Sequence, residues 1–386
     1  MKPLPLAPSM PGPRASWADR WHAWRDRTLA SRRFQRWAAA FPLTRLVAHR
    51  RARALFDLVA GFVYSQVLLA CVRLRLFEAL AEGPQTLAAL RQRLSLPEDG
   101  AKRLLAAAVS LRLVEPRGEE RYGLGPLGAP MVGNAALAAM VEHHAALYAD
   151  LSDPVALLRG RAGPAALANY WPYACGEAPR SLSADHVAGY SELMSASQPL
   201  VADEILDAYP FAKHRCVMDV GGGEGTFLSF AAQRAPDLRL VLFDLPAVAE
   251  RAQARFTALG LAQRAVAVGG DFLADPLPRG ADLVTLIRVV HDHDDARVLA
   301  LLEAIRRALP PQGTLLIAEP MARTPGAQAM GDAYFGFYLL AMGRGRPRSA
   351  AQLTTLLNAA GFGQVRLLRT RMPLQTRLLV AKPLLP

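Results

Sequence analysis

Two ionisable residues, His291 and Glu319, each follow an apolar run in the C-terminal half of the chain. His291 ends the run 281–290, and Glu319 ends the run 313–318. A neutral imidazole is the side chain best suited to take a proton from a hydroxyl group near pH 7. A carboxylate bonded to its other nitrogen fixes the tautomer and stabilises the imidazolium that forms. The pair therefore predicts general-base catalysis on a hydroxyl, with His291 as base and Glu319 as its partner.

The segment 291–295, His-Asp-His-Asp-Asp, also allows two other interpretations. Acidic residues suit the positive end of a helix, and we expect this role for Asp294 and Asp295. A metal site built on His291 and His293 would need a defined strand or turn geometry and further ligands. We therefore expect no metal here.

A glycine-rich turn at 219–225, Asp-Val-Gly-Gly-Gly-Glu-Gly, is a candidate cofactor site. It lies between the strand-like run 216–220 and the helix-like segment 226–235. Glycines let such a turn bring backbone N–H groups close to a ligand at the positive end of the helix. A dinucleotide fingerprint beginning at Gly221 would need a glycine where this chain has Thr226. The shorter turn suits a ligand without a pyrophosphate.

Acidic residues also end the next two strand-like runs. Asp244 follows the run 239–243, where a carboxylate can bind both ribose hydroxyls. Asp271 and Phe272 follow the run 265–268 and offer an acceptor and an aromatic face to a purine ring. Together with the glycine turn, these strand ends predict a site for S-adenosylmethionine (SAM). The predicted SAM-binding residues are Asp219, Gly221, Gly223, Asp244, Leu245, Asp271, Phe272 and Arg288.

Strands and helices alternate through the C-terminal part, which predicts a mostly parallel, doubly wound α/β sheet. Ligands of such sheets bind beyond the carboxyl ends of the strands, so the glycine turn, His291 and Glu319 should face one crevice. Two closing strands joined by a short turn predict an antiparallel edge. Besides those above, we expect strands at 281–290, 313–318, 364–370 and 375–381, and helices at 296–309, 328–342 and 349–360. Ser349 and Gln352 should form a capping box at the start of the last helix.

The chain is expected to divide into three parts, at 1–53, 54–200 and 201–386. The middle part is rich in Ala and Leu and helical in pattern. Within it, 86–111 is typical of a helix-turn-helix whose first residue is an N-cap, and 113–124 of a small β-wing. A winged helix in a basic chain also suggests DNA binding. Because its second helix is mainly a packing surface, we expect no nucleic acid.

The first part is a Pro-rich tail followed by a basic extension. Between Arg14 and Arg53 there are 11 Arg and two Asp, which is +9 of the chain's net charge of +12. Trp17, Trp21 and Trp24 recur at i, i+4 and i+7, on one face of a helix. Such a helix suits peripheral contact with an anionic membrane. Alternatively, its aromatic rings pack on the protein itself or on a dimer partner while Arg faces water.

Composition is that of a globular protein, with 52% hydrophobic and 20% charged residues among 386. The three cysteines share no CxxC spacing, which favours reduced thiols in a cytoplasmic protein. The first residues lack a signal-peptide pattern. The apolar run 58–72 is shorter than the roughly 20 residues that span a bilayer. We therefore expect a cytoplasmic protein, peripheral to the inner membrane.

Five motifs taken in order resemble one family. They are Asp-Val-Gly-Gly-Gly-x-Gly at 219–225, Phe-Asp-Leu-Pro at 243–246, Gly-Asp-Phe at 270–272, His-Asp at 291–292 and Glu-Pro at 319–320. Behind a winged-helix domain, they resemble the SAM-dependent O-methyltransferases of the plant caffeate type, from about residue 55 to the C-terminus. The basic extension, the block 55–80 and the segment 288–295 are more similar to bacterial relatives in photosynthetic pigment synthesis.

The resemblance implies a Rossmann-like catalytic domain behind an N-terminal all-α/winged-helix dimerisation domain, and a homodimer. It also implies that the base is His291. Two positions depart from the plant pattern. The plant enzymes carry a second catalytic Glu after the helix at 328–342, where this chain has Gly-Arg-Gly-Arg-Pro-Arg at 343–348 and no acid. They also carry a SAM-contacting Lys four residues before the base, where this chain has Ile287.

The implied acceptor is the tertiary C-1 hydroxyl of an acyclic carotenoid such as hydroxyneurosporene. A polyene acceptor requires an apolar tunnel, and the aromatic residues of 334–342 are candidates for its lining, although such a helix face is more often core. One alternative is a relative that methylates a bacteriochlorophyll precursor at carbon. Another, of a different class, is a winged-helix regulator that binds SAM or a pigment without turnover.

Overall fold

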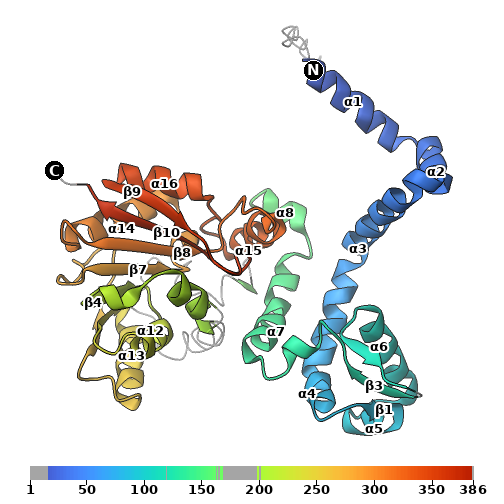
Figure 1. The fold of residues 1–386 in the computed structure, drawn as a ribbon, viewed down its shortest axis with the longest axis horizontal. Helices are drawn as coiled ribbons and strands as arrows, with labels where there is room; N and C mark the ends of the chain where they lie inside the picture. The colour runs from blue at the N-terminus through green and yellow to red at the C-terminus, as the bar shows by residue number, and fades with distance from the viewer. Residues whose placement is uncertain are drawn as a thin grey trace, which may run out of the picture. The chain divides into compact units, whose positions relative to one another are not determined.

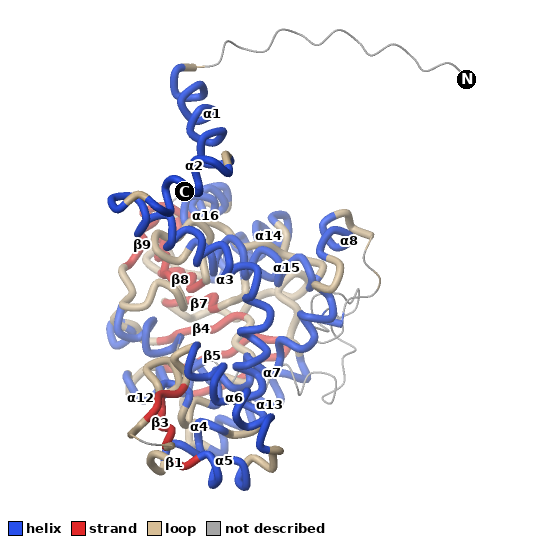
Figure 2. Tube along the Cα trace, turned by 90° about the vertical axis from the view of Figure 1, so that its right-hand side faces the viewer, coloured by secondary structure: helices blue, strands red, loops and turns tan. Residues whose placement is uncertain are grey.

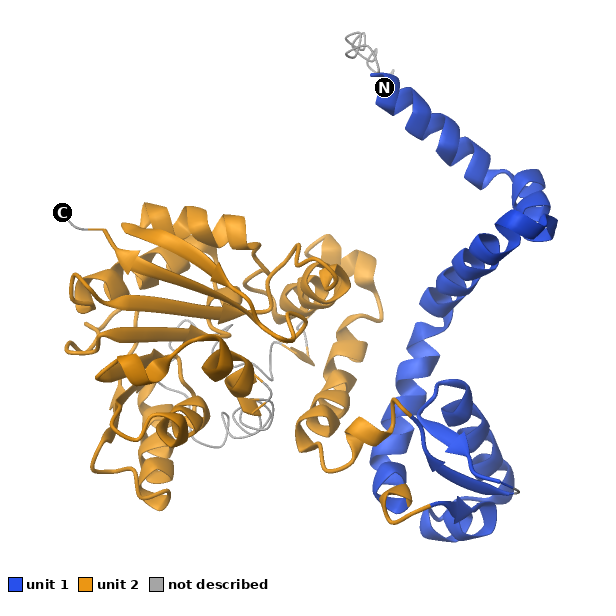
Figure 3. Ribbon diagram, in the orientation of Figure 1, with its two compact units in different colours: residues 1–79, 84–125 blue, residues 80–83, 126–386 orange. Residues whose placement is uncertain are grey.

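The computed structural model describes residues 16–118, 120–161, 163, 166–167, 198–199 and 201–384. The chain forms two compact units, one of residues 1–79 and 84–125 and the other of residues 80–83 and 126–386 (Figure 3). The division into three parts at 53 and 200 stays a prediction. Cys71 and Cys216 are free and buried, whereas Cys175 lies outside the described residues.

The first unit contains the expected winged helix. The Thr86 side chain accepts a hydrogen bond from the Ala89 N–H at 3.2 Å, which is the predicted N-cap. Leu90 and Leu105, one from each helix of the helix-turn-helix, are fully buried. The three strands pair antiparallel in the order β1-β3-β2. The elements are α4 (Leu76–Ala81), β1 (Gln85–Thr86), α5 (Leu87–Arg93), α6 (Glu98–Ser110), β2 (Val114–Pro116) and β3 (Arg121–Leu124).

Three helices precede the winged helix and extend from it one after another (Figure 1). They are α1 (Trp17–Ala30), α2 (Arg32–Ala40) and α3 (Pro42–Arg73). Ser16 opens α1 with a capping box to Asp19. Pro42 takes the first position of α3, where its missing N–H costs no hydrogen bond.

Helix α3 is longer than the apolar run counted in the sequence. It has 32 residues, and an 18-residue window with a mean hydropathy of 1.9 is only 6% buried. The helix continues through Ser65 and Gln66, which interrupt the run without ending it. By length and composition alone, α3 is therefore able to cross a membrane. The expectation that the apolar run is too short to span a bilayer does not apply to this helix.

The second unit is a layered α/β domain on a seven-stranded sheet of order β6-β5-β4-β7-β8-β10-β9. Strands β4 to β8 run parallel, and β10 pairs antiparallel with both β8 and β9. Figure 2 shows β8, β7, β4 and β5 one above another. The strands are β4 (Cys216–Val220), β5 (Arg239–Asp244), β6 (Ala265–Gly269), β7 (Leu283–Ile287), β8 (Thr314–Glu319), β9 (Phe362–Leu368) and β10 (Arg377–Pro383).

Helices cover both faces of this sheet and create two hydrophobic cores. Successive residues of a strand point to opposite faces, and β4 shows this directly. Met218 and Val220 pack with α14 and α16, whereas Val217 packs with α12 and α13. The helices that cover the sheet are α12 (Thr226–Arg234), α13 (Pro246–Ala258), α14 (Asp295–Ala308) and α16 (Ala350–Ala359), while α7 (Ala135–Asp150), α8 (Pro154–Leu158) and α15 (Phe335–Met342) form a separate hydrophobic cluster. The predicted capping box of α16 is present at Ser349 and Gln352.

Two expected elements differ in the structure. The strand expected at 281–290 ends at Ile287, because Arg288 takes a left-handed conformation with φ of 55° and a short 3-10 helix, Val290–Asp292, follows. The helix expected at 328–342 begins as a π-helix, Ala329–Tyr334, before it continues as α15. Such π segments occur often at functional sites, and both departures lie next to His291.

Candidate active site

The glycine turn joins β4 to α12 at the carboxyl edge of the sheet. Gly221, Gly223 and Gly225 have φ of 71°, 59° and 74°, a left-handed conformation that suits glycine. A Cβ atom on Gly221 would lie 2.8 Å from Val289 Cγ2. The turn therefore packs directly against the segment that follows β7. The Gly221 N–H donates to the Phe243 carbonyl at 2.8 Å, which ties the turn to the end of β5.

Asp219 is the next-to-last residue of β4, just before the glycines of the turn. Its side chain is buried, and Oδ1 accepts a hydrogen bond from the Thr285 hydroxyl at 2.6 Å. Oδ2 has no hydrogen-bond partner among the described residues, and it would lie 2.7 Å from a Cβ atom on Gly222. Burial raises the pKa of this carboxyl group to about 7. Asp219 thus leaves a buried acceptor at the base of the turn.

The carboxylate of Asp244 reaches the glycine turn from the end of β5. Oδ2 accepts from the Gly223 N–H at 2.8 Å, and Oδ1 accepts from the Leu245 N–H at 2.7 Å. Burial raises the pKa of Asp244 to about 6 and outweighs the opposite effect of these hydrogen bonds. The structure therefore brings three of the predicted SAM-binding residues into direct contact.

Asp271 and Phe272 follow β6 in a short turn. Asp271 Oδ1 accepts from the Leu273 N–H at 2.9 Å, and its own N–H donates to Asp275 Oδ2 at 2.8 Å. The Phe272 ring makes a T-shaped contact with His293, with ring centroids 5.3 Å apart. Burial lowers the pKa of His293 to about 4. This contact connects the end of β6 to the segment that carries His291.

His291 and Glu319 meet as the sequence predicts. Both side chains are buried, and His291 Nδ1 is in hydrogen-bond contact with Glu319 Oε2. The other carboxylate oxygen, Oε1, accepts from the backbone N–H groups of Val289 at 3.0 Å and Val290 at 2.7 Å. Glu319 thus holds both the imidazole ring and the backbone on which it is carried. Their catalytic roles stay predictions.

A second carboxylate, that of Asp292, faces the other ring nitrogen. Asp292 Oδ1 lies 3.2 Å from His291 Nε2. Burial by itself would lower the pKa of His291, but the carboxylates of Asp292 and Glu319 raise it to about 9. Burial raises the pKa of Asp292 to about 6. The positive charge of Arg288 lowers the pKa of both His291 and Asp292. Arg288, one of the predicted SAM-binding residues, therefore acts electrostatically on both side chains.

The sequence pattern did not predict that Asp292 belongs to the site. Its position next to His291 in the sequence does not show whether its carboxylate contacts the imidazole ring. The pattern did assign Asp294 and Asp295 to the start of a helix. The Asp294 side chain does accept from the Arg297 N–H at 2.9 Å and caps α14. That prediction is confirmed.

Aromatic rings from the π-helix and α15 lie beside the histidine. Phe335 makes a T-shaped contact with His291, with ring centroids 5.9 Å apart. Tyr338 and Met342 instead belong to a buried cluster with residues of α7 and α8. Only part of the aromatic face considered as a tunnel lining therefore lies at His291, and the rest is core.

Two histidines of α7 hold this aromatic segment in place. His143 Nε2 lies 2.7 Å from the Tyr338 hydroxyl, and His144 Nε2 lies 2.8 Å from the Tyr334 hydroxyl. Burial lowers the pKa of both histidines, that of His143 to about 4. Both imidazoles are thus neutral at pH 7 and able to exchange hydrogen bonds with the phenols.

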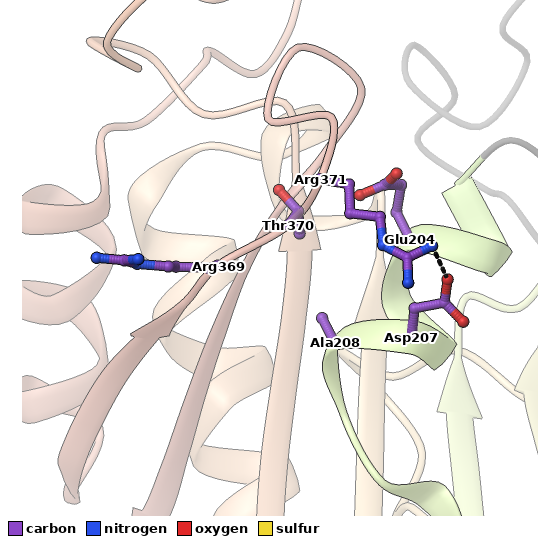
Figure 4. Close-up of a pocket in the computed structure, with 6 residues that line it drawn as sticks. All are labelled: Glu204, Asp207, Ala208, Arg369, Thr370 and Arg371. Carbon is purple, nitrogen blue, oxygen red and sulfur yellow. Dashed lines mark ion pairs between the residues drawn. The ribbon is translucent and has the colours of Figure 1, made fainter.

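A separate pocket of about 200 Å³ opens between the helix at 201–208 and the turn after β9 (Figure 4). Asp207 in this pocket pairs with Arg371 at 2.9 Å, and Glu204 accepts from the Met372 N–H at 2.9 Å. The pocket is lined by Glu204, Asp207, Ala208, Arg369, Thr370 and Arg371. None of these is a predicted site residue.

The residues at the carboxyl edge fit SAM. The glycine turn permits close approach of a ligand to its backbone N–H groups. The buried Asp219 Oδ2 offers an acceptor to an ammonium group, and the half-buried Phe272 offers an aromatic face. Within the described residues, no group of three or more His, Cys, Asp or Glu is arranged to hold a metal ion.

Sequence comparisons identify two domains of one family in this chain. The model of the O-methyltransferase domain matches residues 148–363, and that of the O-methyltransferase dimerisation domain matches residues 56–134. Demethylspheroidene O-methyltransferase of Cereibacter sphaeroides is 43% identical over 88% of this chain and 89% of its own. The enzyme of the same name from Rhodobacter capsulatus is 41% identical over 98% and 94%. Acetylserotonin O-methyltransferase of Mus musculus is 32% identical over 84% and 87%.

Solved structures share the fold. CalO1, a methyltransferase in calicheamicin biosynthesis crystallised with S-adenosylhomocysteine (SAH), superposes with a TM-score of 0.71 at 26% identity, over 86% of this chain and 98% of its own. The structure of LaPhzM has a TM-score of 0.69 at 25% identity, over 86% and 99%. The predicted fold class is thereby confirmed, and the chain belongs to the SAM-dependent O-methyltransferase family, with the catalytic and dimerisation domains of that family.

Proposed function

We propose that this chain transfers the methyl group of SAM to the tertiary C-1 hydroxyl of an acyclic hydroxycarotenoid, such as demethylspheroidene or hydroxyneurosporene, in spheroidene biosynthesis. The observation that carries this proposal is the likeness to two demethylspheroidene O-methyltransferases over most of both chains. The buried pair of His291 and Glu319 supports it, because an alcohol acceptor must lose a proton as its oxygen is methylated.

In this proposal each residue of the pair has a separate task. SAM supplies an electrophilic methyl group on a positively charged sulfur. His291 Nε2 takes the hydroxyl proton as the new O–C bond forms and the S–CH3 bond breaks, which leaves the neutral thioether SAH. Glu319 fixes the opposite nitrogen and stabilises the imidazolium. In the free protein, the two carboxylates favour a protonated ring. A nearby sulfonium charge disfavours that form, so SAM binding prepares His291 to act as a base.

Methyl transfer from labelled SAM tests the acceptor. Hydroxyneurosporene, demethylspheroidene and a bacteriochlorophyllide are each offered in detergent to the wild type and to His291→Ala. We expect label on the carotenoids with the wild type and at least a hundredfold less with the variant, while both still bind SAM. Label on the tetrapyrrole alone would indicate the carbon-methylating relative. SAM binding without label on any acceptor, together with salt-sensitive binding to duplex DNA, would indicate a regulator.

We further propose that residues 14–53 bind the anionic cytoplasmic face of the photosynthetic membrane. Trp17 is 80% exposed and Trp24 is 58% exposed in α1. The net charge of +9 on this segment favours anionic headgroups. The exposed apolar window of α3 supports the same location. The whole of residues 14–53 precedes the match to the dimerisation domain, which begins at residue 56.

Liposome co-sedimentation tests this second proposal. We expect the full chain to bind vesicles rich in phosphatidylglycerol more than vesicles of phosphatidylcholine, and to lose this preference when residues 1–53 are removed. The double variant Trp17→Ala and Trp24→Ala should bind at least several-fold more weakly. Leu259→Ala removes a residue of the second unit that is 52% exposed, and it serves as the matched control. Equal binding by the full and shortened chains would refute membrane contact through this segment.

A further inference from the structure

The segment 343–348, which follows α15, packs directly against the backbone of His291. The Arg346 N–H donates to the His291 carbonyl at 2.9 Å. Gly345 has φ of 79°, and a Cβ atom there would lie only 2.1 Å from the same carbonyl oxygen. Only glycine permits this approach. The basic segment is therefore fitted to the base, although it contributes no carboxylate.

Arg348 makes the most extensive contacts in this segment. Its side chain is almost fully buried, at 3% exposure. Nη1 donates to the Val290 carbonyl at 2.7 Å, and Nη2 donates to the His293 carbonyl at 2.7 Å. Nε and Nη2 both donate to Asp295 Oδ1, at 2.8 and 2.6 Å. One guanidinium thus holds the backbone on both sides of His291 and the first residue of α14.

The backbone of Arg348 also reaches the segment after Glu319. The Ala322 N–H donates to the Arg348 carbonyl at 3.0 Å. An isolated parallel bridge between Ala322 and Ser349 continues this contact. Arg348 therefore adds a connection between the two segments that carry the base and its carboxylate partner. These segments are also joined by the pairing of β7 with β8 and by the contacts of Glu319 with His291 and the backbone before it.

We propose that Arg348 is a positioning residue for methyl transfer, which keeps the imidazole of His291 aligned between Glu319 and the acceptor by fixing the carbonyl groups on either side of it. This inference rests on the proposed role of His291 as base. Asp295 pairs with both Arg348 and Arg346, so one carboxylate partly compensates the charge of two guanidinium groups in this segment.

The geometry requires arginine rather than a positive charge. A planar guanidinium presents donors in several fixed directions, whereas the ammonium of lysine is a single point on a flexible stem. Lysine in place of Arg348 retains the charge and the pairing with Asp295 but cannot reach the carbonyls of Val290 and His293 together. Arg348→Lys therefore separates positioning from electrostatics.

Arg306 provides a matched control at the opposite end of α14. It also donates from a guanidinium to backbone carbonyls, those of Gly361 at 3.1 Å and Leu384 at 3.4 Å. Arg306→Lys therefore removes an arginine bridge between segments of the same unit without touching the segment of His291. A loss of stability in this variant shows what a purely structural arginine contributes.

The test compares Arg348→Lys, Arg306→Lys and the wild type by kcat, by KM for SAM and for the carotenoid, and by SAM affinity from calorimetry. We expect kcat to fall about 10- to 100-fold in Arg348→Lys, since displacement of a catalytic group by 1 Å can cost this much. Both KM values and the SAM affinity should change less than threefold. Arg306→Lys should keep the wild-type kcat. Equal kcat in all three proteins, or an equal fall in both variants, would overturn the proposal.

Two further measurements remain informative if methyl transfer to carotenoids is not observed or if a variant folds poorly. Histidine NMR titration measures the pKa of the His291 ring without any acceptor present. The His291 signal is assigned by its loss in His291→Asn. Asp292, Glu319 and Arg288 face this ring and are unchanged in Arg348→Lys. A lower midpoint for His291 in that variant would support the proposal, and an unchanged midpoint would contradict it.

Chemical rescue provides the second measurement. Arg348→Ala should regain methyl transfer, or the wild-type His291 titration, with millimolar propylguanidinium. Propylammonium has the same charge without the fork of donors and should fail. Equal rescue by both cations would mean that charge, not the positioning of carbonyl groups, is what Arg348 provides.

Discussion

The carboxylate of Glu319 binds His291 with one oxygen and the backbone before His291 with the other. Oε2 contacts the ring at Nδ1, while Oε1 accepts from the N–H groups of Val289 and Val290. The ring and its backbone are thus fixed by the same side chain. The other ring nitrogen, Nε2, lies 3.2 Å from Asp292 Oδ1 and is the atom to which we assign proton transfer.

Replacing Glu319 by Gln should lower kcat strongly. The amide keeps the size of the side chain and can still accept hydrogen bonds, but it no longer stabilises an imidazolium. We expect a fall of about 100-fold, within the range for general-base catalysis, with SAM affinity within threefold of the wild type. Steady-state kinetics and calorimetry measure the two quantities. Wild-type kcat in Glu319→Gln would show that Glu319 is not the partner of the base.

The rate of methyl transfer should depend on the ionisation of His291. Burial opposes the charged ring, but Asp292 and Glu319 prevail and raise its pKa to about 9. A base must be neutral, so kcat/KM for the carotenoid should rise with pH, with a midpoint below this value because the positive charge of bound SAM lowers the pKa of His291. In Glu319→Gln the midpoint should move to lower pH, because one of the two raising carboxylates is gone. An unchanged midpoint of the pH profile in Glu319→Gln would contradict the assignment of His291 as the base.

The same raised pKa has a consequence for stability with a definite sign. A histidine whose pKa is higher in the folded state stabilises that state below its unfolded pKa of about 6.5. This contribution is lost as pH rises through about 9. The free energy of unfolding of the wild type, relative to His291→Asn, should therefore decrease between pH 6.5 and 9. Urea unfolding at several pH values measures it, and a difference independent of pH would refute the coupling.

Asp244→Asn should weaken SAM binding. Its carboxylate organises the glycine turn through the Gly223 N–H and is predicted to accept the ribose hydroxyls. Losing charged hydrogen bonds of about 1.5–3 kcal/mol corresponds to a rise in Kd of about 10- to 150-fold. Because burial raises the pKa of Asp244 to about 6, wild-type affinity should also decrease below pH 6. Calorimetry measures the Kd for SAM, with Asp203→Asn, a change at an exposed carboxylate, as the control. An equal Kd in Asp244→Asn and the wild type would contradict the prediction.

Gly221→Ala and Gly260→Ala form a matched pair for the glycine turn. Their φ values of 71° and 69° carry the same conformational cost for alanine, about 1–2 kcal/mol. At Gly221 the new methyl group also overlaps Val289, whereas nothing lies within 4 Å at Gly260. Thermal unfolding should show a loss in both variants, greater for Gly221→Ala. SAM affinity should fall only in Gly221→Ala, and an equal fall in Gly260→Ala would argue against a specific role of the turn.

The local features of this protein follow from its sequence alone. Periodicity and turn chemistry depend on neighbouring residues, so the alternation of strands and helices, the glycine turn before α12 and the caps at Thr86, Asp294 and Ser349 could all be predicted. The carboxyl-edge rule then placed Asp244, His291 and Glu319 on one edge of the sheet.

The contacts between distant groups, in contrast, depend on how whole elements pack in three dimensions. The insertion of β10 between β8 and β9, the approach of Asp292 to the free nitrogen of His291 and the bonds of α7 to the tyrosines all join segments whose patterns are independent. Arg348 is the clearest case, because nothing in an arginine beside Ser349 indicates that it binds carbonyl groups about 55 residues away. Such contacts follow from the packing of whole elements, and no local signal in the chain encodes them.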